Sequence, residues 1–165
     1  SYPKPVIMLA EGAAMAGGLG MLCAGDIVVV TEDCKFALTE TTLGIPPAQI
    51  APFVSQRIGL AKARRIMLTA ARFTGKEAHE MGLADFVAKD ADDLKVIEAD
   101  IKKGVLKCAP GANAVTKEIV LATRHLTRKE MIEFAAKGFA ERMLSDEGKE
   151  GISSFIEKRK PKWSK

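Results

Sequence analysis

The sequence predicts an α/β fold in which a core of short strands and helices is followed by a helical layer. Two observations indicate this arrangement. Up to residue 90, short apolar runs rich in β-branched residues alternate with small-residue or amphipathic stretches. Past Asp90 the strand-like runs stop, and amphipathic stretches follow one another to the C-terminus. We therefore expect a core region over residues 1–90 and a helical region over residues 91–165.

The composition is that of an ordinary globular protein. Of the 165 residues, 47% are hydrophobic, which is enough to bury a core. The longest apolar run is too short to cross a bilayer, and the N-terminus has no secretory-signal pattern. The three cysteines show neither CxxC spacing nor nearby histidines, which argues against a zinc site or a disulfide framework. We expect reduced thiols, no bound metal, no membrane association, and a location in the cytoplasm or the mitochondrial matrix.

The first forty residues predict the order strand, helix, strand, strand. "KPVIMLAEG" is a buried strand closed by a glycine, and a turn follows it. The small apolar residues from Gly17 to Ala24 suit a tightly packed helix that begins at the glycines. "DIVVVT" predicts a second buried strand and "CKFAL" a third, shorter one.

The next fifty residues predict a shaped loop and then helices. "TETTLGIPPAQIAP" is too rich in glycine and proline for a long regular element. In "FVSQRIGLAKARRIMLTA", Gly59 divides a short helix from one with a clear apolar face. A capped helix from Thr74 ends at Gly82 and leads into the strand "ADFV".

The helical region predicts four helices and a basic tail. The helices are expected over roughly residues 92–106, 112–125, 128–144 and 149–159. The tail "EKRKPKWSK" places five basic residues behind one acid. It is either a solvated end or a contact for an anionic group.

Four stretches in this order resemble the crotonase (enoyl-CoA hydratase/isomerase) superfamily. They are "KPVIMLAEGAAMAGGLGMLCAGDIVVV", "CKFALTETTLGIPP", "ARRIMLTAARFTGKEAHEMGLADFV" and "GISSFIEKRKPKW". The resemblance implies a β/α spiral core, an acyl-CoA thioester as substrate, and no cofactor apart from the CoA of that substrate. It also implies a helical layer that mediates a trimer or a dimer of trimers.

The same resemblance implies a companion N-terminal segment. Subunits of the family carry roughly a hundred further residues before the region that this chain matches. That number fits the length of a typical single domain, about 250 residues. We expect this chain to be the C-terminal portion, with the second oxyanion-binding N–H and much of the CoA-binding wall supplied by that segment.

The glycine pair in "AAMAGGLG" is the first candidate for chemistry. A thioester carbonyl that accepts electrons becomes an oxyanion, and backbone N–H groups at a helix start stabilise such a charge. Two isolated glycines could equally serve a tight turn. The resemblance assigns the donor to the amide of Gly17, with Gly18 keeping the turn open.

Glu40 is the second candidate. It follows an apolar stretch at the edge of the core, where the hydroxyls of Thr39 and Thr41 are available to orient its carboxylate. The resemblance places it on the family's general acid/base glutamate, in the segment F-x-x-x-E-x-x-x-G.

Gly20 marks a departure from the common hydratase pattern, which has a second glutamate at this position. We expect either that Gly20 leaves room for a branched acyl group or that it only lets the helix pack closely. Within the family, "LGIPPAQIAPFVSQRIG" and "ARRIMLTAARF" are most similar to hydratases of isohexenylglutaconyl-CoA, which take part in acyclic terpene breakdown, and then to methylglutaconyl-CoA hydratases.

The remaining substrate contacts come from the resemblance alone. It assigns Pro47 to substrate binding, and Phe155 and Lys158 to the CoA adenine and its 3′-phosphate. An ammonium group and a phosphate form a natural charge pair. Arg159, Lys160 and Lys162 are assigned no role.

Three functions are consistent with these residues. The first is a hydratase that adds water across the α,β double bond of an enoyl-CoA with a single glutamate. The second is an enoyl-CoA isomerase that uses the same two groups. The third is a non-catalytic protein that binds RNA or a partner, since the superfamily has an RNA-binding member. Glu40 favours the enzymes, and the short basic cluster has no interleaved aromatic residues, which disfavours nucleic acid.

Overall fold

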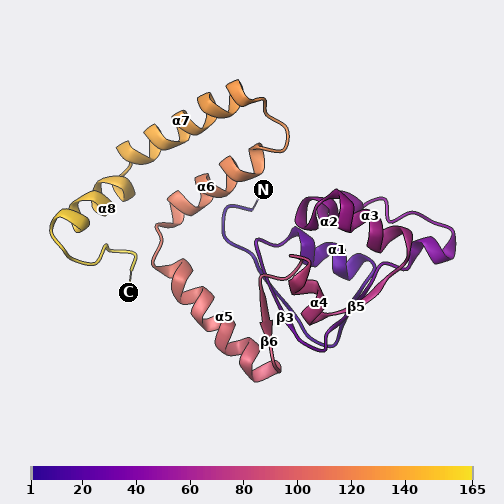
Figure 1. Ribbon diagram of the computed structural model, residues 1–165. Coiled ribbons are helices and arrows are strands. Elements are labelled where there is room, and N and C mark those ends of the chain that lie inside the picture. Colours follow the sequence, from indigo (N-terminus) through magenta and orange to yellow (C-terminus); the bar gives the residue numbers. More distant parts are fainter. Residues whose placement is uncertain (1, 165) are drawn as a thin grey trace. The chain divides into compact units, whose positions relative to one another are not determined.

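The computed structural model describes residues 2–164 and confirms the α/β class (Figure 1). The chain forms two compact units. The core unit comprises residues 6–100, and the helical unit comprises residues 2–5 together with residues 101–164. The change in sequence character at Asp90 coincides with the start of helix α5 (Ala91–Leu106), whose N-terminal part still belongs to the core unit.

The core unit contains two small sheets and four α-helices. The strands are β1 (Ile7–Ala10), β2 (Ala13–Met15), β3 (Ile27–Thr31), β4 (Lys35–Ala37), β5 (Arg72–Thr74) and β6 (Phe86–Ala88). The helices are α1 (Gly17–Ala24), α2 (Ala51–Ile58), α3 (Leu60–Leu68) and α4 (Gly75–Glu80), with a 3₁₀ turn η1 (Glu40–Leu43). The first sheet has the order β1-β3-β6 and is entirely parallel. In the second, β4 pairs parallel with β2 and antiparallel with β5.

Strand β3 is the centre of the first sheet, as its sequence predicts. Val28, Val29 and Val30 are all fully buried, so the strand is covered on both faces. A continuous β-branched run without polar alternation is typical of such a parallel central strand. The core of this unit also buries Leu19 of α1 and Ile66 of α3 completely.

Two strands, β2 and β5, were not predicted from the sequence. The residues of β2 are Ala-Ala-Met, which carry no β-branched side chain, and each strand is only three residues long. Their pairing with β4 holds them, because tertiary context outweighs propensity in short strands. Phe36 of β4 lies opposite Phe73 of β5, and the two rings stack with centroids 5.4 Å apart.

The helical unit contains α6 (Pro110–Ala122), α7 (Arg128–Leu144) and α8 (Asp146–Ile156). The bounds of α7 are those predicted. Helix α8 lies three residues earlier than predicted, because the Ser145 hydroxyl accepts a hydrogen bond from the Gly148 amide and so caps its N-terminus. Within residues 2–164, no helix combines the length and the apolar character needed to cross a membrane.

The cysteines give the first testable expectation. All three are free thiols; Cys23 and Cys34 are buried, while Cys108 is exposed. Desolvation raises the pKa of both Cys23 and Cys34 to about 11, which leaves almost no thiolate at neutral pH. We expect iodoacetamide at pH 7.5 to modify Cys108 alone in the folded protein and all three residues after denaturation, as counted by mass spectrometry. Rapid labelling of Cys23 or Cys34 in the folded protein would contradict the burial of these two thiols in the core.

Candidate functional site

Parallel pairing of two strands brings the predicted residues to one sheet edge. Met15, the last residue of β2, lies opposite Ala37, the last residue of β4. The pairing continues one step further, because the Ala16 amide donates to the Ala37 carbonyl at 2.9 Å. Gly17 follows directly on one strand, and Glu40 follows three residues later on the other. The carboxyl edge of parallel strands is where α/β proteins commonly place ligands.

The Gly17 amide stands at an uncapped helix start. It is the first residue of α1, and the residue before it provides no side-chain hydrogen bond to the helix. The first turn of α1 contains no acidic residue that would offset the positive end of the helix dipole. Gly17 is exposed, and a Cβ built on it would meet no atom within 4 Å. The backbone at the start of α1 is therefore exposed, and its first amides can donate to a developing negative charge.

The backbone at Ala16 is unusual and sets the direction of this amide. Ala16 has φ 47° and ψ −119°, a conformation that glycine adopts readily and alanine rarely. The ψ angle of Ala16 orients the peptide plane that carries the Gly17 N–H. Strained backbone of this kind concentrates at functional sites.

Glu40 carries a buried carboxylate oxygen without a partner. Its Oε2 atom is inaccessible to solvent and makes no hydrogen bond. Leaving such an oxygen unpaired costs about 1–3 kcal/mol, so structural carboxylates rarely do so. The residue itself is only half-buried, at the start of η1. A carboxylate held in this way can exchange protons with a ligand that reaches the sheet edge.

The hydroxyl contacts near Glu40 correct the expectation that the Thr41 hydroxyl orients its carboxylate. The Thr41 hydroxyl donates to the Met67 carbonyl at 3.0 Å, and the Thr42 hydroxyl donates to the Thr39 carbonyl at 2.7 Å. The hydroxyls of Thr41 and Thr42 therefore fix the turn, and the Thr41 hydroxyl does not orient the Glu40 carboxylate. The turn ends at Gly44, whose φ of 75° is left-handed and favours glycine.

Gly20 does not open onto free space. A Cβ built at this buried glycine would lie 2.2 Å from Cγ2 and 2.5 Å from Cβ of Ile50, just before α2. The expectation that Gly20 leaves room for a branched acyl group is therefore wrong for this structure, because the Ile50 side chain occupies that room. The alternative holds: Gly20 lets α1 and α2 pack closely. Sequence reasoning missed Ile50, which lies thirty positions from Gly20 and carries no motif.

The other predicted substrate contacts lie in several places. Gly18 is exposed beside Gly17, with only the Ala14 Cβ within 4 Å of a Cβ built there. Pro47 is half-buried in the loop before α2, where its carbonyl accepts from the Ala51 amide at 2.9 Å. Phe155 and Lys158 belong to the helical unit, and the Phe155 side chain is 85% exposed.

Comparisons with known proteins identify the family to which the chain is similar. The family model described as enoyl-CoA hydratase/isomerase matches residues 1–165. A Bacillus subtilis protein named "Probable enoyl-CoA hydratase" is 35% identical over 99% of this chain and 64% of its own length. A peroxisomal Δ(3,5)-Δ(2,4)-dienoyl-CoA isomerase of Arabidopsis thaliana is 31% identical over 98% of this chain and 59% of its own. The chain thus spans less than two thirds of the length of these relatives.

Two solved structures have the same fold as this chain. Pseudomonas aeruginosa AtuE superimposes with a TM-score of 0.96 at 45% identity, covering 99% of this chain and 63% of AtuE. An enoyl-CoA hydratase/isomerase from Marinobacter aquaeolei superimposes with a TM-score of 0.94 at 40% identity. These matches confirm the crotonase-type fold predicted from the sequence.

Proposed function

Because the chain belongs to the enoyl-CoA hydratase/isomerase family, we propose that it acts on enoyl-CoA thioesters as a hydratase. The observation that carries this proposal is the buried, unpartnered Oε2 of Glu40 at the sheet edge where the uncapped amides of α1 also begin. The substrate is an acyl-CoA thioester, and its CoA is not a separate cofactor.

In the proposed reaction the Gly17 amide stabilises negative charge, and Glu40 transfers protons. As water attacks the β carbon, the α,β π electrons move toward the thioester and its carbonyl oxygen becomes negative. The Gly17 N–H stabilises that oxyanion, an effect worth about 2.7–4 kcal/mol per donor in comparable sites. Glu40 accepts the proton of the attacking water and delivers a proton to the α carbon. The product gains one water, and the carboxylate is regenerated.

For the acyl group we propose a branched chain, with isohexenylglutaconyl-CoA as the first compound to test. The similarity of residues 43–59 and 63–73 to hydratases of that substrate supports the choice. Gly20 no longer supports it, because Ile50 fills the adjoining space.

An enoyl-CoA isomerase is the second candidate. A single carboxylate can move a proton between two carbons of the acyl chain without water. The relative from Arabidopsis that is named as a dienoyl-CoA isomerase favours this alternative. The same oxyanion donor would serve both reactions.

We also propose that the protein assembles as a trimer or a dimer of trimers through its helical unit. Large apolar side chains are exposed along α7 and α8, namely Ile132, Phe139, Leu144, Ile152 and Ile156. Contiguous exposed apolar surface is typical of protein interfaces. Light scattering should give three or six times the chain mass, and a stable monomer would contradict the assembly.

An absorbance and mass assay tests the reaction. The protein is incubated with isohexenylglutaconyl-CoA and with a short linear 2-enoyl-CoA while the conjugated-thioester absorbance is recorded. A hydratase removes that absorbance and adds the mass of one water, whereas an isomerase changes the absorbance at constant mass. Absence of both changes with every enoyl-CoA, including 3-enoyl isomers, would contradict the proposed function.

A further inference from the structure

Helix α1 carries the proposed oxyanion donor at its exposed end, and side chains do not hold that end. Gly17 and Gly18 are exposed, and a Cβ built at either would meet at most the Ala14 Cβ within 4 Å. Ala16, before them, supplies no side-chain hydrogen bond to the helix. A misplacement of about 1 Å at a reacting centre can lower a rate about a hundredfold. The buried side of α1 and its C-terminal end must therefore fix the position of the Gly17 amide.

The C-terminal end of α1 is bound by Arg57, in the last turn of α2. The carbonyls of Gly25 and Asp26, the two residues after α1, accept hydrogen bonds from Arg57 Nη1 at 3.3 and 3.4 Å. Asp26 is also tied to the residue before β1, because its carboxylate accepts from the Val6 amide at 2.7 Å and its amide donates to the Val6 carbonyl at 3.0 Å. A cation at the C-terminal end of a helix also complements the helix dipole.

The guanidinium of Arg57 is itself anchored to the first sheet. Its Nε donates to the Leu83 carbonyl at 2.9 Å, and its Nη2 pairs with the Asp85 carboxylate. Asp85 in turn binds both main-chain groups of Val28 in β3: its carboxylate accepts from the Val28 amide at 2.7 Å, and its amide donates to the Val28 carbonyl at 2.8 Å. Only 13% of the Arg57 side chain is exposed. Because the guanidinium is planar and rigid, one group joins the end of α1 to the sheet.

Helix α2 contacts α1 in two places. Just before α2 begins, the Ile50 side chain lies against Gly20 in the first half of α1. In the last turn of α2, Arg57 binds the residues that follow α1. The charge of Arg57 also reaches α1: desolvation raises the pKa of Cys23, and the Arg57 charge opposes that rise. Helix α1 rises about 12 Å over its eight residues, so these two contacts define the direction of its axis.

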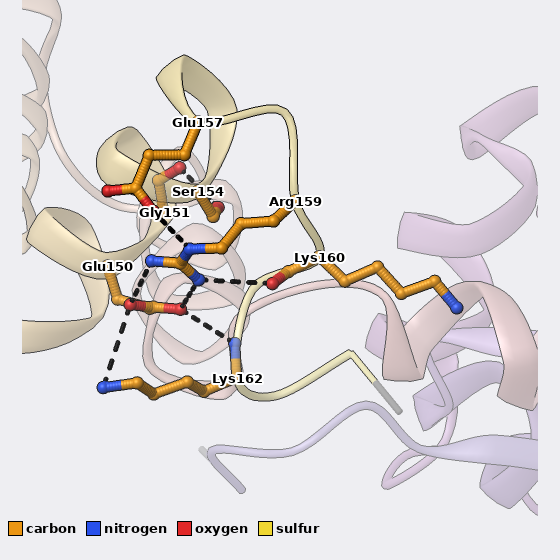
Figure 2. A network of polar contacts seen from close by, with 7 residues as sticks. All are labelled: Glu150, Gly151, Ser154, Glu157, Arg159, Lys160 and Lys162. Atoms are coloured by element: carbon orange, nitrogen blue, oxygen red, sulfur yellow. Dashed lines mark hydrogen bonds and ion pairs between the residues drawn. The ribbon is translucent and has the colours of Figure 1, made fainter.

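The arginine network of the tail after α8 differs from that of Arg57 (Figure 2). There the Arg159 guanidinium donates to the Glu150 carboxylate at 2.6 and 3.1 Å and to the Glu157 carboxylate at 2.6 Å. Those contacts hold the tail against α8 within the helical unit. Arg57 pairs with one carboxylate, and its other three hydrogen bonds go to backbone carbonyls. The contacts of Arg57 therefore fix main chain, on which the direction of α1 depends.

We propose that Arg57 is a positioning residue for oxyanion stabilisation: its guanidinium ties the C-terminal end of α1 to the turn before β6, and so fixes where the Gly17 N–H points. The inference rests on the proposed function, because it takes the Gly17 amide as the donor to a thioester carbonyl. Arg57 acts from the opposite end of α1 and is not a catalytic residue.

Infrared spectroscopy of a bound thioester tests this inference on the whole protein. The ligand is a saturated acyl-CoA with an isotopic label at the thioester carbonyl, whose stretching frequency falls when N–H groups donate to it. We expect the wild type to lower this frequency, and Arg57→Met and Arg57→Lys to lose most of that lowering. Lysine keeps the charge, but its single nitrogen cannot reach acceptors on both sides. In both variants kcat for hydration should fall about 10- to 100-fold with KM nearly unchanged, because the donor acts mainly in the transition state.

Lys62→Met is the matched control for a loss of stability alone. The Lys62 ammonium also ties a helix to main chain, through a hydrogen bond to the Met81 carbonyl at 2.7 Å, but this contact does not involve α1. The control should melt at a lower temperature and keep the wild-type carbonyl frequency and kcat. If Arg57→Met does not fold, Arg57→Lys decides alone.

Two results would overturn the proposal and leave the proposed function standing. One is a folded Arg57→Lys protein with the wild-type carbonyl frequency. The other is a loss of the frequency shift in Lys62→Met equal to that in Arg57→Lys. A wild type that binds the thioester without lowering its carbonyl frequency would overturn the proposed role of the Gly17 amide as well.

Discussion

Replacing Glu40 by glutamine is expected to lower kcat about 10²- to 10⁴-fold, with acyl-CoA binding nearly unchanged. Glutamine preserves the size of the side chain and one acceptor oxygen, but it cannot exchange a proton. Because the proposed oxyanion donor is the backbone amide of Gly17, the substitution leaves that group intact. The measurement is steady-state hydration together with binding of a saturated acyl-CoA that cannot react.

Two further variants make the Glu40 result specific. Glu80→Gln changes an exposed carboxylate of the same unit and should keep wild-type kcat. Glu40→Met removes the unpartnered Oε2 altogether, so it should abolish turnover while raising thermal stability by roughly 1 kcal/mol. A Glu40→Gln protein with wild-type kcat would remove this residue from the mechanism.

Gly20→Ala is expected to destabilise the protein by about 1–3 kcal/mol, or several degrees in melting temperature, although alanine is the better helix former. The added methyl group would overlap Ile50 at both Cγ2 and Cβ. Ile50 cannot simply withdraw, because it leads into α2 and Arg57 fixes that helix. The Arg57 side chain donates to the Leu83 carbonyl at 2.9 Å and pairs with Asp85.

Gly104→Ala is the matched control for this prediction. Gly104 also lies within a helix, and a Cβ built on it meets nothing within 4 Å. The substitution there should be neutral or stabilising by up to about 1 kcal/mol. Gly20→Glu should destabilise at least as strongly as Gly20→Ala. A Gly20→Ala protein that melts at or above the wild-type temperature would contradict the close packing of Gly20 against Ile50. It would favour the alternative that Gly20 lies beside the bound acyl group.

Local patterns predicted much of the fold. The β-branched run of β3, the glycine start of α1 and the periodic apolar face of α3 each identify their element, because the signal lies within the element itself. Strand β2 could not be found in this way, since Ala-Ala-Met becomes a strand only through pairing with β4. The same pairing is what brings Gly17 and Glu40 to one edge.

The candidate site was predictable only where a residue carries its own signal. Gly17 and Glu40 were identified through their places in the motifs of the family that the sequence resembles. The filling of the Gly20 space by Ile50 depends on a contact between two helices, and no spacing rule encodes it. Glu150 and Arg159 are nine positions apart, which is not a helical neighbour spacing, and they meet only because the chain reverses at Lys158.

Deuterium transfer from solvent tests the central claim most directly, namely that Glu40 moves a proton at the carbon next to a thioester held by the Gly17 amide. The protein is incubated with an enoyl-CoA that it hydrates, in D₂O, and the product is analysed by mass spectrometry and NMR. The account predicts one deuteron on the α carbon of the hydrated product, at a rate that falls at least a hundredfold in Glu40→Gln. Undiminished α-deuteration by Glu40→Gln would contradict it.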